Sequence, residues 1–248
     1  SVSGDTETTF QDGLLYDGGD LDFLGISDSQ RDIPDIPEDG VDANFARALT
    51  NNSSLLIIQE GTVPVDVGFS MSGGNRYDLN QDISMGLIAA ASYSNDWRTR
   101  KGTRGFADSA GDGLSERFSY DLYSTENSVD VNGFVSLGFD LYDNHEIKGT
   151  ALIVRSTDKE ARTVQGIDFD DNFERDDAIE WFERQLWTTQ LSGEHFFPGL
   201  LDLKIDWRAS YSEALRDAPY QFNILYQDSG NGLQTLANAA DTTFGFSR

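Results

Sequence analysis

The stretch Leu201-Asp-Leu-Lys-Ile-Asp-Trp-Arg-Ala-Ser-Tyr-Ser212 alternates between two kinds of residue over its whole length. Its odd-numbered residues are apolar or aromatic, and its even-numbered residues are charged or carry a hydroxyl group. Successive side chains of a strand point to opposite faces of a sheet, whereas a helix would scatter this pattern around its circumference. The stretch therefore predicts a β-strand with one apolar and one polar face.

The same alternation recurs along the chain. It is clear at 65–72, 83–93 and 131–142, whereas the stretches 147–157 and 181–196 do not show which residues share a face. Strands are expected as follows: one ending near Phe10, then 63–73, 83–99, 116–142, 146–161, 180–196 and 200–213, and another beginning after Tyr220. The pattern predicts an all-β fold, an antiparallel meander of about seven or eight strands.

The expected connections differ in length. Short polar turns are predicted at 73–82, 142–146 and 197–200. Longer links rich in Asp and Gly are predicted at 11–62, 102–116 and 166–178, the first with a possible helix at 41–49. Short turns at one end and long loops at the other are typical of outer-membrane β-barrels, so we interpret 11–62 as a long extracellular loop.

Composition excludes several classes of function. The chain has 43 acidic and 18 basic residues and a formal net charge of -25, which argues against nucleic acid and against docking of a basic patch on anionic lipid. It has no Cys and only two His, so thiolate sites and His-based metal clusters are excluded. No apolar run approaches the ~20 residues of a transmembrane helix, but a transmembrane strand averages out to polar.

An alternating strand fits a membrane barrel or a soluble sheet, and three features favour the membrane. The stretches 131–142 and 201–212 reach the ~9–11 residues that a tilted strand needs to cross a bilayer. Aromatic residues cluster towards strand ends, as in interfacial girdles, and the turns are unequal. A secreted β-sandwich is the alternative. Because single-chain barrels have an even number of at least ~8 strands, we interpret residues 1–248 as one partial barrel domain.

The alternation assigns residues to two faces of this barrel. Expected to face lipid are Val65, Val67, Phe69, Met71, Leu87, Ala89, Tyr93, Val131, Val135, Leu137, Phe139, Leu141, Leu201, Leu203, Ile205, Trp207 and Tyr211. Expected to face the lumen are Asp66, Asp140, Asp202, Lys204, Asp206 and Arg208. Opposite charges alternate along the second set, so we interpret it as a hydrated wall and not as a catalytic acid–base pair.

Several segments resemble TonB-dependent receptors of Gram-negative bacteria. The segment Trp181-Phe-Glu-Arg-Gln-Leu-Trp-Thr-Thr-Gln-Leu-Ser-Gly-Glu-His195, with 203–214 and 216–220, is similar to early barrel hairpins of that family. Upstream, Asp143-Asn-His-Glu-Ile-Lys-Gly-Thr-Ala-Leu-Ile-Val-Arg155 looks like the preceding periplasmic turn and strand. The stretch Asp12-Gly-Leu-Leu-Tyr-Asp-Gly-Gly19 resembles the first extracellular loop.

The resemblance implies a function as well as a fold. Members of the family hold a plug domain inside a barrel of roughly twenty-two strands, and TonB pulls on a short N-terminal box to drive import. Neither a plug nor a TonB box is recognisable in this sequence, so the resemblance implies a fragment of the barrel. The implied partners are outer-membrane lipid and lipopolysaccharide, the protein's own plug, TonB and a small-molecule ligand. The implied location is the bacterial outer membrane.

Other candidate sites are weighed against simpler interpretations. The acidic residues Asp168, Asp170, Asp171, Asp176 and Asp177 would suit a cationic ligand, a metal chelate or Ca²⁺. Their spacing does not match an EF-hand loop, so a solvated, charge-repelled surface loop is the favoured interpretation.

The two histidines and one serine motif are the remaining candidates. His145 and His195 lie beside predicted short turns and are interpreted as turn and interfacial residues, not metal ligands. The stretch Gly68-Phe-Ser-Met-Ser72 lacks the final Gly and the following helix of a nucleophile elbow. We therefore expect no enzyme activity, no catalytic or metal site and no cofactor.

Two further hypotheses stay beside TonB-dependent import of a ferric siderophore or a similar chelate. A passive porin or adhesin barrel would share every strand feature. A secreted acidic β-sandwich that binds Ca²⁺ or carbohydrate would be stable without detergent.

Overall fold

The computed structural model describes residues 2–7, 12–27, 57–110, 113–142, 144–168, 172–228, 230, 234–236 and 243–247. The helix expected at 41–49 lies outside these residues, as do Asp170 and Asp171. Among the described residues no helix is both long and apolar enough for a membrane span.

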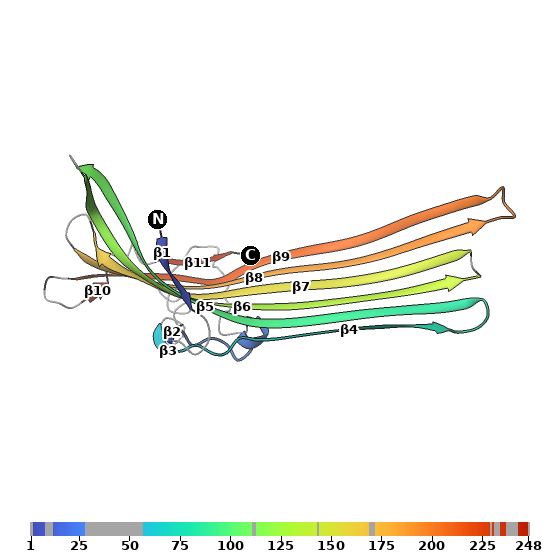
Figure 1. The fold of residues 1–248 in the computed structure, drawn as a ribbon, viewed down its shortest axis with the longest axis horizontal. Coiled ribbons are helices and arrows are strands. Elements are labelled where there is room, and N and C mark those ends of the chain that lie inside the picture. The colour runs from blue at the N-terminus through green and yellow to red at the C-terminus, as the bar shows by residue number, and fades with distance from the viewer. Residues whose placement is uncertain are drawn as a thin grey trace, which may run out of the picture.

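Six long strands form an antiparallel meander, which confirms the expected all-β fold class in this coarser sense. They are β4 (Val67–Asp78), β5 (Ile83–Ala110), β6 (Gly113–Leu141), β7 (His145–Ile167), β8 (Phe173–Phe197) and β9 (Leu203–Asp228). Each strand pairs with the next along the chain. Figure 1 shows them side by side, with short hairpin turns at one end of the sheet.

Short strands complete the two edges of the sheet at the end away from these turns. On one edge, β1 (Val2–Glu7) pairs with β5 next to the part of β5 that pairs with β4. On the other edge, β10 (Gln234–Leu236) and β11 (Thr243–Ser247) pair with β9. In the described part of the chain β4 and β9 do not pair with each other, so the sheet there is open.

Several predicted boundaries are wrong because the strands are longer than the apolar alternation. The expected link 102–116 is almost entirely strand, since β5 and β6 continue as one hairpin to Ala110 and Gly113. The expected link 166–178 shrinks likewise between Ile167 and Phe173. β9 runs through Tyr220 to Asp228, so the strands that begin after Tyr220 are the short β10 and β11. Cross-strand hydrogen bonds hold the extended β5–β6 hairpin together. In the extended part of β9, Phe222 and Ile224 also belong to the hydrophobic core.

The turn-side ends of the strands also differ from expectation. β4 runs from Val67 to Asp78, so the first six residues of the predicted turn 73–82 belong to the strand. Val65 and Asp66 precede β4 and lie in no strand. Leu201 and Asp202, predicted to face lipid and lumen, lie in the turn before β9 with φ of 57° and 56°. Leu201 is fully exposed, so its apolar character does not mark a strand face.

The register settles which residues share a face. Directly opposed residues on antiparallel strands lie on the same side of the sheet. The row Ala89–Val135–Ala151–Thr189–Tyr211 joins odd-numbered residues of five strands. The row Ala90–Phe134–Leu152–Thr188–Ser212 joins even-numbered ones. The facing of 147–157 and 181–196, left open by the sequence, follows from this register; we name the two sides the odd face and the even face.

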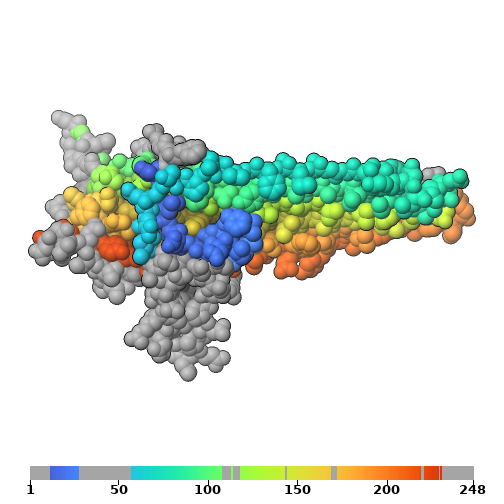
Figure 2. Space-filling view, turned by 90° about the horizontal axis from the view of Figure 1, so that it is seen from below, coloured from blue at the N-terminus to red at the C-terminus, as the bar shows by residue number. Residues whose placement is uncertain are grey.

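Part of the predicted loop 11–62 is ordered against the odd face. It contains β2 (Asp12–Leu15), which pairs with β3 (Gln59–Thr62), and a 3-10 turn, η1 (Asp22–Leu24). The hydrophobic core lies beneath it, in the half of the sheet away from the short turns. Its buried members are Leu14, Tyr16, Ala161, Ile179, Trp181, Phe222 and Ile224. Figure 2 shows segment 12–27 ending part-way along the sheet, with the turn-side half left uncovered.

Candidate functional site

The turn-side half of the odd face is apolar along β5 and β6 and open to solvent. Six successive rows of β5 and β6 begin at Ile83–Leu141 and end at Tyr93–Val131. Large side chains here are well exposed, including Met71 at 67%, Leu191 at 47% and Val135 at 42%. In a water-soluble sheet such a face would be covered by other elements, because apolar burial drives folding.

The height of this apolar band matches a bilayer. From Ile83 to Tyr93 the chain advances ten residues, or roughly 33 Å at about 3.3 Å per residue. A strand tilt of about 40° would reduce this to about 25 Å, the height of the apolar band on outer-membrane barrels. In the row beyond Tyr93, Thr157 and Glu183 lie beside the buried Val129, and the covered core begins.

The residues predicted to face lipid fall on this odd face wherever they lie in a strand. The register brings together Val67, Phe69, Met71, Leu87, Ala89, Tyr93, Val131, Val135, Leu137, Phe139, Leu141, Leu203, Ile205, Trp207 and Tyr211. Val65 and Leu201 are the exceptions described above. The grouping shows a shared face, and its contact with lipid stays a prediction.

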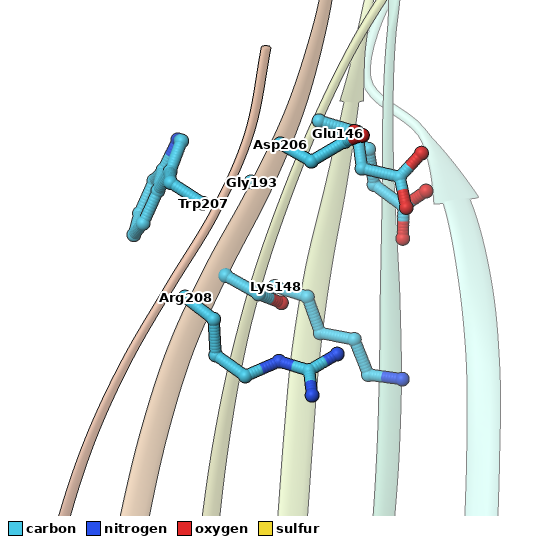
Figure 3. Close-up of a pocket in the computed structure, with 8 residues that line it drawn as sticks. Glu146, Lys148, Gly193, Asp206, Trp207 and Arg208 are labelled. Carbon is cyan, nitrogen blue, oxygen red and sulfur yellow. The ribbon is translucent and has the colours of Figure 1, made fainter.

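The even face carries ordered rows of charge near the short turns. Glu146, Glu194 and Asp206 form one row across β7, β8 and β9, and Lys148 and Arg208 flank Ser192 in the next row. They line a shallow cavity of about 310 Å³. Figure 3 shows the Lys148 and Arg208 side chains on one side of the ribbon and Trp207 on the other.

Weak ion pairs connect these charges. Lys204 Nζ lies 3.6 Å from the carboxylates of both Glu194 and Asp206, and Arg76 lies 3.0 Å from Asp140. All of these side chains are about half exposed or more, and exposed pairs contribute only about 0–1 kcal/mol each. Of the predicted lumen residues, Asp140, Lys204, Asp206 and Arg208 share this face, and the arrangement suits a hydrated wall better than proton transfer.

A second charged row lies on the even face in the half away from the short turns. Glu126, Glu160 and Glu180 are directly opposed on β6, β7 and β8. Burial raises the pKa of the Glu160 carboxyl, and the two neighbouring glutamates raise it further, against an opposing effect of Arg162. Like charges directly opposite on adjacent strands destabilise a sheet. The Glu160 carboxyl in this row is therefore protonated up to a higher pH than that of an isolated glutamate.

The two histidines meet at the turn end of the odd face, which the sequence did not indicate. Trp207 Nε1 lies 3.0 Å from His195 Nε2, and the Nδ1 atoms of His195 and His145 lie 3.3 Å apart. The indole N–H can only donate, so His195 Nε2 accepts this hydrogen bond. The proton of the neutral His195 ring is then on Nδ1, which donates a hydrogen bond to His145 Nδ1. This tautomer leaves no lone pair on His195 Nδ1 for a metal. No cluster of three or more metal-binding side chains occurs in the described ranges.

Gly193 makes this contact possible. A Cβ at Gly193 would lie 2.5 Å from Trp207 Nε1, so only glycine lets the indole lie across β8 to reach His195. Sequence reasoning did not single out Gly193, because alternation records which face a residue occupies and not how closely a neighbour approaches.

The predicted acidic ligand residues do not form one cluster among those described. Asp176 and Asp177 are consecutive in β8 and therefore lie on opposite faces. Asp177 accepts hydrogen bonds from Thr163 and Arg175, both at 2.8 Å. Burial, and then Asp177, raise the pKa of the Asp176 carboxyl, against the opposing effect of Arg162. Asp168 accepts hydrogen bonds from Asn172 within its own turn.

A buried network that the sequence did not reveal holds segment 12–27 on the odd face. Arg155 contacts Glu183 at 2.6 Å and also donates to the carbonyl oxygen of Gly25. Glu183 is 7% exposed and also accepts from Trp181 Nε1 and the backbone N–H of Ser27. The groups come from distant parts of the chain, so only the fold shows that they are partners.

A comparison with family models, curated proteins and solved structures returns no match for this chain. The class of protein is therefore the one that the fold defines, an all-β protein built on an antiparallel meander of long strands. The functional interpretation depends on the two faces of that meander.

Proposed function

We propose that this chain is part of the wall of an outer-membrane β-barrel. The observation that carries the proposal is the contrast between the two halves of the odd face. One half is covered by segment 12–27 and contains the core, while the other is apolar over six rows and uncovered. Lipid is the environment that makes such a surface stable, and the band has the height of a bilayer core.

The polar face supports a transport function. On the proposed wall the even face lines a hydrated lumen, where Lys148, Arg208 and the row of carboxylates lie in water. The resemblance to TonB-dependent receptors then gives the particular function, which is energised import of a scarce nutrient such as a ferric siderophore or similar chelate. A plug domain and TonB would be the partners of the whole protein.

Refolding tests the membrane proposal. The full chain is diluted from denaturant into plain buffer and into detergent micelles, and both samples are examined by circular dichroism and size-exclusion chromatography. We expect aggregation in buffer and β structure in micelles, because the apolar rows need a nonpolar environment. A β-rich monomer in plain buffer would contradict the membrane wall and favour a soluble sheet.

A further inference from the structure

The 3-10 turn η1 and its flanking residues are built with their polar groups facing the sheet. Asp22 forms an ion pair with Lys159 at 2.7 Å, and both side chains are more than four-fifths buried. The carbonyl oxygen of Gly25 accepts hydrogen bonds from Arg155 at 2.9 Å and Thr157 at 2.7 Å. The Asp22 carboxylate and the Gly25 carbonyl oxygen therefore both contact side chains of the sheet.

Glycine at position 25 allows this close approach. Gly25 has φ of 66°, in the left-handed region that other residues rarely adopt. A Cβ there would also lie 2.8 Å from Thr157 Oγ1 and 3.2 Å from Val129 Cβ. The backbone of the turn is thus pressed against β6 and β7 and held in one orientation.

Three apolar side chains of the same segment are exposed, while Leu24 between them is half-buried. Phe23 is 56% exposed, Leu21 39% and Ile26 37%. A loop adapted to water would make the opposite arrangement, with apolar groups buried and carboxylates exposed. A nonpolar environment on the outer side of the turn would stabilise this arrangement.

The turn lies at the upper boundary of the apolar band. The hydroxyl of Tyr93, in the last apolar row, donates to the carbonyl oxygen of Phe23. Gly25 contacts Thr157, which belongs to the row beyond Tyr93. The turn therefore lies beside the edge of the band, over β6 and β7; Figure 2 shows segment 12–27 lying on the sheet at this point.

We propose that Leu21, Phe23 and Ile26 form a lipid contact at the interface of the membrane, beside the loop-side edge of the band. This inference rests on the proposed membrane wall and names a further part of its lipid-contacting surface. The partner is the boundary between headgroups and acyl chains, where amphipathic elements bury apolar side chains ~5–10 Å deep. The inward ion pair and hydrogen bonds orient the turn for this contact.

Spin labelling of the full chain in phospholipid vesicles tests the inference. The sequence has no Cys, so a single introduced cysteine carries a single nitroxide. We would label Phe23→Cys and, in case that variant folds poorly, Ile26→Cys. Collision rates with oxygen, which concentrates in lipid, and with a water-soluble nickel chelate are then compared. Asp17→Cys is the matched control, being exposed on the same segment but polar.

Three outcomes are distinguishable when Leu137→Cys reports on the band itself. We expect oxygen to dominate strongly at Leu137 and by a smaller factor at Phe23 and Ile26, with nickel dominating at Asp17. Nickel dominance at Phe23 and Ile26 with oxygen dominance at Leu137 would overturn the interfacial contact and leave the membrane wall intact. Nickel dominance at Leu137 would overturn the membrane wall, and the inference with it.

Discussion

Single residues set how closely the strands and the covering segment approach. Gly193 lets the Trp207 indole cross β8, and Gly25 lets segment 12–27 lie flat on β6 and β7. The buried Arg155–Glu183 pair then fixes that segment, with Glu183 receiving three donors in all. Packing at the two glycines depends on the lack of a side chain, and packing at Glu183 depends on a paired charge. One substitution tests each of these two requirements.

Gly193→Ala should destabilise the fold. The added methyl group would overlap the Trp207 indole, which would have to move and lose its hydrogen bond to His195. Overpacking of this kind costs about 1–3 kcal/mol. The measurement is urea unfolding in micelles, with Gly86→Ala as control because a Cβ at Gly86 meets nothing within 4 Å. Equal midpoints for the two variants would show that the indole contact does not constrain position 193.

Arg155→Ala should release segment 12–27. It leaves the buried Glu183 carboxylate without its ion-pair partner, and breaking a buried pair costs roughly 3–5 kcal/mol. Hydrogen exchange in micelles should accelerate at the backbone N–H groups of Leu14 and Ser27, which bond to the sheet. Arg184→Ala is the control, because Arg184 is 58% exposed. Unchanged protection in Arg155→Ala would contradict the anchoring role.

The strands as elements show what alternation can and cannot predict. The interiors of β5, β6 and β9 were predictable from sequence because one face of each is apolar. Their outer ends were not: residues 100–105 of β5 include no large apolar residue and pair with β6. Leu201 obeys the alternation but lies in a left-handed turn, since hydrophobicity carries no information about φ. The histidine chain and the Glu183 network depend on register, which no single strand reveals.

Glu160→Gln should stabilise the fold near neutral pH. The pKa of Glu160 is raised in the folded state, so between its unfolded and folded pKa values the native protein binds more protons than the unfolded chain. Stability therefore falls as pH rises through that window and is restored below it. At pH 7.5 the urea midpoint of Glu160→Gln should be higher than that of the parent protein. At pH 4 the difference between the two midpoints should be smaller. A difference independent of pH would contradict the account of the glutamate row.

Leu191→Arg should impair folding into vesicles far more than Gln190→Arg. The two positions are neighbours in β8, both exposed and on opposite faces. Arg near the middle of a lipid-facing band costs about 2–4 kcal/mol, whereas a lumen position leaves it hydrated. The folded fraction is read from the heat-modifiable shift on electrophoresis. Equal yields for the two variants would show that the odd and even faces meet the same solvent.

At the scale of the whole molecule, one half of the odd face is covered by the chain itself and the other half is not. The chain itself covers the loop-side half with Leu14, Tyr16 and their neighbours, and the resulting core includes Trp181 at 1% exposure. The turn-side half keeps its apolar rows uncovered along the strands seen in Figure 1. Near the short turns the even face carries the charged rows of Glu146, Glu194, Asp206, Lys148 and Arg208, which suits a wall between lipid and water.

The most direct test of this wall is a nitroxide scan of residues 131–141 in β6, one cysteine at a time, with the full chain in phospholipid vesicles. β6 is paired on both sides, so its two faces are well defined. The account predicts that the ratio of oxygen to nickel-chelate collisions rises and falls with a period of two, with maxima at the odd positions. A flat profile, or maxima at the even positions, would contradict it.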